Sequence, residues 1–236
     1  SMLDFSEAFR AALWQIATLD PRLIEIIGLS LKVTLTAVAI ATLIGFALGG
    51  VLAVYRFPGR SAVAALLNAL MGLPPVVAGL IVYLVLSNAG PLGVLQLLYT
   101  PQAMIIAQVI LVMPIVAALT RQTCEDLLEE YRDQLRSLGA SSAEVVTTLL
   151  WDGRYRLITA VLAGFGRAIA EVGAVMIVGG NIDHVTRTMT TAIALETSKG
   201  NIALALALGM ILLAIALVVN VALMGIRRLA SQFAYA

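Results

Sequence analysis

Five long apolar stretches run through this chain of 236 residues, and they restrict its fold more than any other feature of the sequence. A helix needs about 20 consecutive apolar residues to cross the hydrocarbon core of a bilayer, which is about 30 Å thick. Each stretch reaches that length. We therefore expect an all-α integral membrane protein, a five-span helical bundle whose spans cover about 23–54, 61–87, 102–123, 157–180 and 203–226.

The composition agrees with a membrane protein and excludes several other classes. Charged residues make up 12% of the chain, against roughly 25% in soluble domains. The 15 Lys and Arg nearly balance the 14 Asp and Glu, so the chain lacks the basic excess of a nucleic-acid-binding protein. One cysteine rules out a disulfide framework, and one histidine leaves no cluster for a metal or for a Ser-His or Cys-His catalytic arrangement. We expect a protein surrounded by membrane lipid that binds no nucleic acid and is not an enzyme.

The Lys and Arg residues in the connections between spans predict the orientation. One side of the membrane collects nine of them and the other four, and the richer side is cytoplasmic by the positive-inside rule. The N-terminus is then outside and the C-terminus inside. Residues 1–22 are too polar to span but carry apolar residues at helical spacing, which predicts an interfacial helix. Residues 23–228 form the transmembrane domain, 124–156 a cytoplasmic loop within it, and 229–236 a C-terminal tail.

The cytoplasmic loop 124–156 is predicted to hold two helices. Acidic residues crowd the expected start of the first, where the helix dipole favours negative charge, and Gly139 suits its C-terminal cap. Ser141 and Glu144 form an S-x-x-E capping box that opens a second helix over about 141–151. Its apolar residues are Val145, Val146, Leu149, Leu150 and Trp151. This helix either folds back on its own bundle or enters a groove of a partner protein.

A motif in this loop resembles the loop of ATP-binding-cassette (ABC) importer permeases, whose pattern is E-A-A, three residues, G, nine residues and I-x-L-P. Gly139 matches the glycine, Leu149 stands at the isoleucine position, and Asp133 replaces the glutamate. The two alanines are Gln and Leu here, and Trp151 and Asp152 replace the final Leu and Pro. The residues assigned to this ATPase-coupling loop are Asp133, Gly139, Ala140, Ser141, Glu144, Val145, Leu149 and Trp151.

The resemblance implies a set of partners. In this family, a coupling helix from each permease of a homodimer sits in a cleft of one of two ATP-hydrolysing subunits, and residues 141–151 would take that place. The chain has no G-x-x-x-x-G-K phosphate loop, so the ATPase would be a separate polypeptide. ATP and Mg would bind to that subunit, and we expect no cofactor in this chain.

Two pairs of residues inside the spans are candidates for a translocation path or gate. Arg167 and Glu171 lie four residues apart near the middle of the fourth span, a spacing that places them on one helical face. Each would cost about 2.5–3.5 kcal/mol at the bilayer centre, so they are expected to pair. The pair either locks the bundle or lies along an anion path. Pro74 and Pro75 mark either a hinge or a static kink.

The sequence around Arg167 and Glu171 resembles one group within this permease family. The run G-R-A-I-A-E-V-G-A at 166–174, followed by G-N-I at 180–182 and a threonine-rich outer segment, is similar to permeases for molybdate, tungstate and sulfate, and most similar to those for tungstate. This implies uptake of an oxyanion received from an extracellular oxyanion-binding protein. Arg187, Thr190 and Thr191 are the residues expected to dock that protein, the alternative being a solvated connection.

The resemblance therefore implies the permease subunit of a tungstate or molybdate importer in the plasma membrane of a prokaryote. Within the same class, a sulfate or amino-acid permease is the alternative. From a different class, a small ion channel or a structural membrane protein would also fit five apolar spans.

Overall fold

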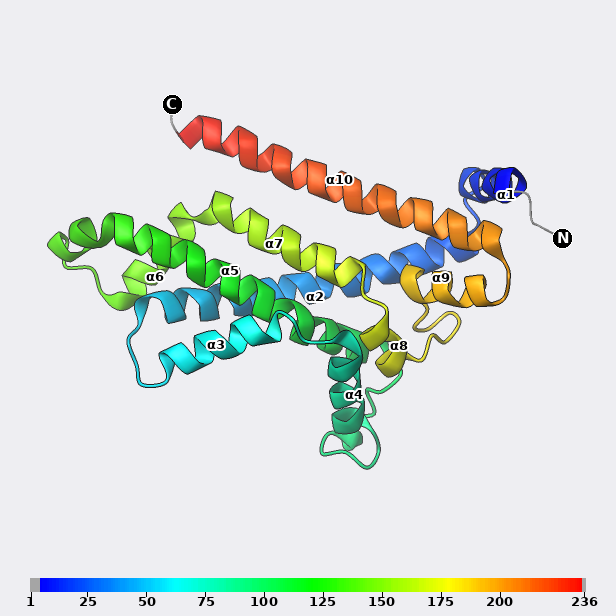
Figure 1. The fold of residues 1–236 in the computed structure, drawn as a ribbon, viewed down its shortest axis with the longest axis horizontal. Helices are drawn as coiled ribbons and strands as arrows, with labels where there is room; N and C mark the ends of the chain where they lie inside the picture. The colour runs from blue at the N-terminus through cyan, green and yellow to red at the C-terminus, as the bar shows by residue number, and fades with distance from the viewer. Residues whose placement is uncertain (1–4, 235–236) are drawn as a thin grey trace. The chain divides into compact units, whose positions relative to one another are not determined.

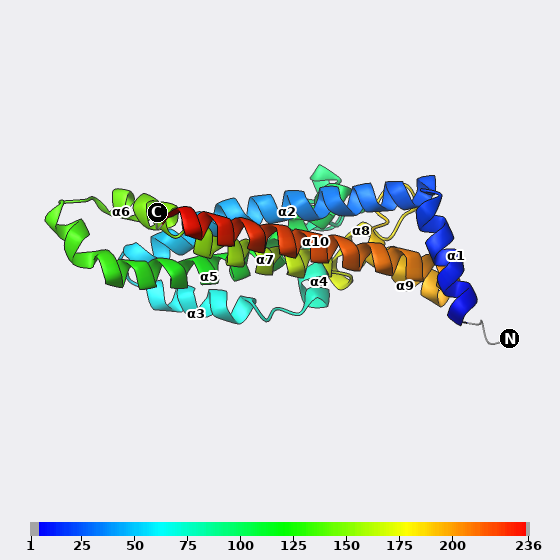
Figure 2. The same ribbon diagram turned by 90° about the horizontal axis from the view of Figure 1, so that it is seen from above.

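The computed structural model describes residues 5–234, with side chains through Leu229, so the outermost residues of both predicted terminal segments lie outside it. Over this range the chain is helical and has no strand, as the apolar stretches predict (Figures 1 and 2). The elements are α1 (Phe5–Ala17), α2 (Pro21–Val54), α3 (Arg60–Leu70), α4 (Pro75–Leu86), the 3₁₀ helix η1 (Gly93–Leu95), α5 (Pro101–Ser137), α6 (Ser142–Asp152), α7 (Arg154–Ile169), α8 (Gly173–Gly179), α9 (Met189–Ser198) and α10 (Ile202–Ala234).

Three helices, α2, α5 and α10, are each long and apolar enough to cross a membrane. Two helix pairs, α3 with α4 and α7 with α8, meet the same criterion only when taken together, because each pair is bent at a break of at most four residues. The described residues thus contain three spans, or five if each bent pair counts as one. Two of the five predicted spans are therefore interrupted rather than continuous.

The prolines account for the first of these breaks. α3 ends at Leu70, and Pro74 adopts an extended conformation (φ −61°, ψ 127°) directly before Pro75, the first residue of α4. A proline has no N–H to donate and moves its predecessor out of the helical region, whereas at the first helical position it is well tolerated. The predicted kink at Pro74 and Pro75 is thus a complete helix break. Pro114, by contrast, lies inside an uninterrupted α5.

Helix α5 joins two elements that the sequence predicts separately. The predicted span over 102–123 and the first helix predicted in the loop 124–156 form one helix of 37 residues. Glu125 therefore lies within a helix rather than at the start of one, and the dipole argument for the acidic residues is wrong. Its carboxylate instead pairs with Arg60 (Nη2–Oε1 2.6 Å) and Arg121 (Nε–Oε1 2.9 Å). Two guanidinium groups compensate this acidic charge.

The chain divides into two compact units, each built from segments that are distant in sequence. Unit 1 comprises Ser1–Thr36, Pro74–Gln108 and Ile169–Val219, and unit 2 comprises Ala37–Leu73, Val109–Ala168 and Asn220–Ala236.

In unit 2, a glycine brings two helices into close contact. A Cβ at Gly49 of α2 would lie 2.6 Å from the carbonyl oxygen of Ala117 in α5. Small residues of this kind allow helix backbones to approach in a membrane, where dispersion rather than water exclusion drives association. Leu52 and Leu67 pack with Ala117 in the core between α2, α3 and α5.

In unit 1, α4 packs against α8 (Figure 1), where Gly79 leaves room for Ala174: a Cβ at Gly79 would lie 2.8 Å from the Ala174 Cα. A second core joins the start of α2 to α9 and α10, and its buried residues are Leu23, Met189, Ala192 and Leu208. This second core positions the polar connection between α8 and α9 beside the start of α2.

Candidate functional site

The caps predicted around the start of α6 are present. Gly139 adopts a left-handed conformation (φ +65°) after the end of α5. The amide of Glu144 donates to Ser141 Oγ (3.4 Å), and Glu144 Oε2 accepts hydrogen bonds from the amide and the hydroxyl of Ser141 (2.7 Å each). These hydrogen bonds, that from the hydroxyl most of all, lower the pKa of the Glu144 carboxyl. The start of α6 is thus determined by local sequence.

Some apolar side chains of α6 are buried against the rest of the chain, and others are exposed to solvent. Val145 and Leu149 are buried in a core with Cys124 and Leu127 of α5, so for them the interpretation as a helix folded back on its own bundle is correct. Their side chains are covered by α5, and the assignment of this segment to an ATPase-coupling loop stays a prediction. The side chain of Trp151 is 67% exposed, and Leu138 is exposed as well.

The indole of Trp151 is supported by a neighbouring arginine. The Arg154 guanidinium lies 4.5 Å from the Trp151 ring centroid and also donates to the Trp151 carbonyl oxygen (2.5 Å). A cation over an aromatic face orients the ring without covering it. Of the other assigned loop residues, Asp133 is exposed and Ala140 packs against the same core as Leu149.

The predicted charged pair does not lie on one continuous helix. α7 ends at Ile169 and α8 begins at Gly173, so Arg167 is in the last turn of α7 and Glu171 is in the break. The expectation of a shared helical face is therefore wrong, because the i to i+4 relation requires an unbroken helix. Pairing of the two side chains stays a prediction.

Each charged residue makes contacts within its own unit. In unit 2, Arg167 Nη2 donates to the carbonyl oxygen of Leu73 (3.2 Å), at the break between α3 and α4. In unit 1, the buried Glu171 carboxylate accepts a hydrogen bond from the amide of Ala174 (3.0 Å) in the first turn of α8. The backbone carbonyl oxygen of Glu171 accepts a hydrogen bond from the Thr190 hydroxyl (2.8 Å). Both side chains thus bind backbone groups where helices are interrupted.

The threonines predicted to dock a binding protein are inside the fold. Thr190 is 9% exposed and Thr191 is fully buried, where its hydroxyl accepts the amide of Thr188 at the start of α9 (2.9 Å). Arg187 is mostly enclosed and pairs with Asp183 (Nη1–Oδ1 2.7 Å). Thr191 thus stabilises the start of α9, and the Thr190 hydroxyl donates to the Glu171 carbonyl oxygen. Docking of a binding protein at Arg187, Thr190 and Thr191 stays a prediction.

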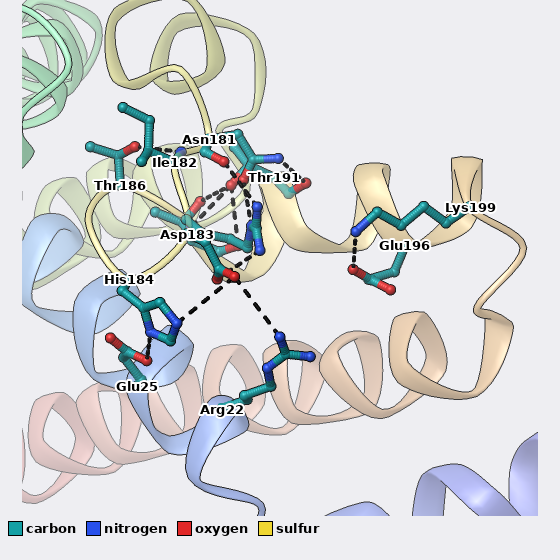
Figure 3. A network of polar contacts seen from close by, with 12 residues as sticks. Arg22, Glu25, Asn181, Ile182, Asp183, His184, Thr186, Thr191, Glu196 and Lys199 are labelled. Atoms are coloured by element: carbon teal, nitrogen blue, oxygen red, sulfur yellow. Dashed lines mark hydrogen bonds and ion pairs between the residues drawn. The ribbon is translucent and has the colours of Figure 1, made fainter.

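Polar side chains between α8 and α9 form a network with the start of α2 (Figure 3). His184 Nδ1 lies 2.7 Å from Glu25 Oε2, and Arg22 lies 3.9 Å from Asp183. The network borders a cavity of about 340 Å³ in unit 1, whose lining also includes Lys32. The sequence alone did not point to this site, although Arg22, Glu25 and Lys32 recur at spacings of three and seven, which place them on one face of α2. Among the described residues, no group of His, Cys, Asp and Glu could hold a metal ion.

Comparison with known proteins identifies the family. No protein-family profile matches the chain. It is 42% identical to a probable anion ABC transporter permease of Haloferax volcanii over 84% of this chain and 88% of that protein. It is 42% identical to the tungstate uptake permease TupB of Peptoclostridium acidaminophilum, over 91% of this chain and 94% of that protein. It is 37% identical to TupB of Campylobacter jejuni, over 91% of this chain and 90% of that protein. Permeases of sulfate transport systems match at 26–31% identity. The chain has apolar helices suited to a multi-pass membrane protein, and it resembles these relatives along most of its length. The chain therefore belongs to the oxyanion group of ABC transporter permeases.

Proposed function

We propose that this permease carries tungstate, or the closely similar molybdate, into the cell. The observation that supports this substrate best is the 42% identity to a tungstate uptake permease over 91% of the chain. Tungstate and molybdate are tetrahedral dianions of nearly equal size, so an extracellular binding protein, rather than the membrane passage, would select between them. Sulfate is the second candidate, because sulfate permeases also match, at lower identity.

In the proposed assembly, two copies of the chain form a homodimer in the plasma membrane of a prokaryote. Two separate ATPase subunits bind ATP and Mg, and this chain contributes no cofactor site and no catalytic residue. Leu138 lies shortly before α6 and Trp151 near its end, and both apolar side chains are exposed. Because nothing in the described chain covers them, they support a docking role for α6. Closure of the ATPase pair would draw the two α6 helices together and open the passage toward the binding protein.

We place the gate of this passage at Arg167, Glu171 and the break at Pro74 and Pro75. The contact of Arg167 with the Leu73 carbonyl supports this, because it joins the charged residue to the interrupted backbone. Arg167→Gln and Glu171→Gln should each lower uptake while leaving ATPase binding unchanged, and Arg167→Lys should keep more activity than Arg167→Gln. Uptake at the wild-type rate in both Gln variants would contradict the gate.

Reconstituted transport tests the substrate. The permease, its ATPase and its binding protein are placed in proteoliposomes, and ATP-driven accumulation of tungstate is measured by elemental mass spectrometry. Molybdate and sulfate compete in parallel samples, and samples without ATP or without binding protein serve as controls. We expect tungstate uptake that molybdate inhibits strongly and sulfate weakly. Preferential sulfate uptake, or accumulation that does not need ATP, would overturn the proposal.

A further inference from the structure

The cavity of about 340 Å³ in unit 1 has the properties of a binding site that the transport assignment does not use. One wall is a single face of α2, where Arg22, Glu25, Gly28 and Lys32 follow one another at spacings of three and four. The connection before α9, α9 itself and the start of α10 form the rest of the lining. Since a water molecule takes about 30 Å³ of liquid volume, the cavity can hold a small anion together with several waters.

The acidic groups of this lining each have a polar partner within the protein. Figure 3 shows His184 beside Glu25 and Asp183 facing Arg22. Asp183 also pairs with Arg187 at 2.7 Å. The third acid, Glu196, binds the ammonium of Lys199 (3.3 Å) and the side-chain amide of Asn201 (2.9 Å). Each carboxylate of the lining thus already has a partner, and none of these contacts involves Lys32.

Lys32 is the cation of the lining that has no such partner in the described part of the chain. It lines the cavity and makes no hydrogen bond or ion pair with any residue that the structure describes. It lies eleven residues after Pro21, about 16 Å along an apolar helix that is long enough to span the membrane. An ammonium in such a segment normally pairs or extends toward water or lipid headgroups. The cavity thus carries one unit of positive charge without a partner in the described chain.

We propose that this cavity binds a tetrahedral oxyanion group through Lys32, with Arg22 and Arg187 contributing positive potential from the rim. The inference rests on the proposed function and deepens it, because it gives the anion a binding site on the permease itself. The same chemistry has two sources: the free dianion that is transported, or the phosphate headgroup of a lipid. Both present several acceptor oxygens and negative charge to an ammonium.

Gly28 provides a way to test the cavity without disturbing its charges. A Cβ built on Gly28 meets no atom within 4 Å, so a larger side chain there occupies the open volume instead of displacing neighbours. Gly209 in α10 is equally unobstructed and does not line the cavity, which makes it the matched control.

Anion binding to the purified permease–ATPase complex, without binding protein, tests the proposal. Equilibrium dialysis measures bound tungstate, and native mass spectrometry of the same samples counts retained phosphatidylglycerol. Lys32→Met should weaken binding of the occupant by about tenfold or more, the loss expected for one hydrogen-bonded charge. Gly28→Leu should also weaken it, whereas Lys32→Arg should keep most of the affinity and Gly209→Leu all of it.

The two measurements distinguish the free dianion from a lipid headgroup as the bound ligand. They also distinguish failure of the proposed site from failure of the proposed transport function. Loss of tungstate in Lys32→Met and Gly28→Leu identifies the free dianion as the occupant, and loss of phosphatidylglycerol alone identifies a lipid headgroup. If neither ligand depends on Lys32 and Gly28, the site is refuted, even where wild-type uptake of tungstate proceeds normally. Absence of ATP-driven uptake in the wild type would refute the proposed transport function instead. Size-exclusion profiles of all four variants verify that the complex has assembled.

Discussion

Truncating the two prominent apolar side chains of α6 should have opposite consequences. Leu149 is fully buried between α6 and α5, so Leu149→Ala should remove about 2–5 kcal/mol of stability through lost contacts and the cavity left behind. Trp151 is 67% exposed, and within the permease its ring contacts chiefly Arg154. Trp151→Ala should therefore cost the permease alone only about 0.5–1 kcal/mol.

For binding of the ATPase, we expect the opposite order: Trp151→Ala should have the larger effect and Leu149→Ala the smaller one. A tryptophan at the centre of an interface commonly contributes about 2 kcal/mol or more, which is about 30-fold in Kd. We expect Trp151→Ala to weaken ATPase binding by at least that factor while the permease stays folded. Leu149→Ala should lower the unfolding midpoint of the permease by several degrees, at about 2–4 °C per kcal/mol for a chain of this size.

Two measurements on each variant test this separation. Thermal unfolding of the detergent-solubilised permease, followed by fluorescence-detected size exclusion, reports stability, and biolayer interferometry reports the Kd of the ATPase. Trp14→Ala is the matched control, because Trp14 in α1 is 71% exposed and lies outside α6. It should change neither quantity. An unaltered ATPase Kd in Trp151→Ala, or destabilisation equal to that of Leu149→Ala, would refute the division of roles within α6.

Three further predictions concern topology, packing and pH. An impermeant thiol reagent should label Val185→Cys, an exposed position, in intact cells of a Cys124→Ser strain; labelling only after lysis would reverse the predicted orientation. Gly49→Leu should prevent stable folding, since even a Cβ there meets backbone at 2.6 Å, whereas Gly209→Leu should fold normally in the same size-exclusion assay. Because the folded pKa of Glu144 is lowered, its contribution to stability is present above the ordinary pKa of about 4.3 and is lost as the pH falls through the folded pKa. Unfolding midpoints should therefore fall more steeply with acidification in the wild type than in Glu144→Gln, and parallel curves would contradict this.

Features that depend on near neighbours in the chain could be predicted from the sequence. The bounds of α2 and the start of α10 follow from runs of apolar residues, and the start of α6 follows from Ser141 and Glu144, three residues apart. Gly139 is predictable for the same reason, since a left-handed cap is a property of one residue. Length, hydropathy and capping are all determined within a few residues, so the protein class and the positions of α2, α6 and α10 could be predicted without a structure.

Tertiary structure decided which side chains are free to act. The same apolar pattern covers Val145, Leu149 and Trp151, yet α5 buries the first two and leaves the third exposed. Arg60 meets Glu125 across 65 residues, and His184 meets Glu25 across 159. Hydropathy describes how each residue interacts with solvent, whereas burial and pairing depend on which segments the packing brings together. The sequence by itself therefore determined a helical oxyanion-type permease, and only the tertiary structure showed the broken spans, the enclosed threonines and the cavity at Lys32.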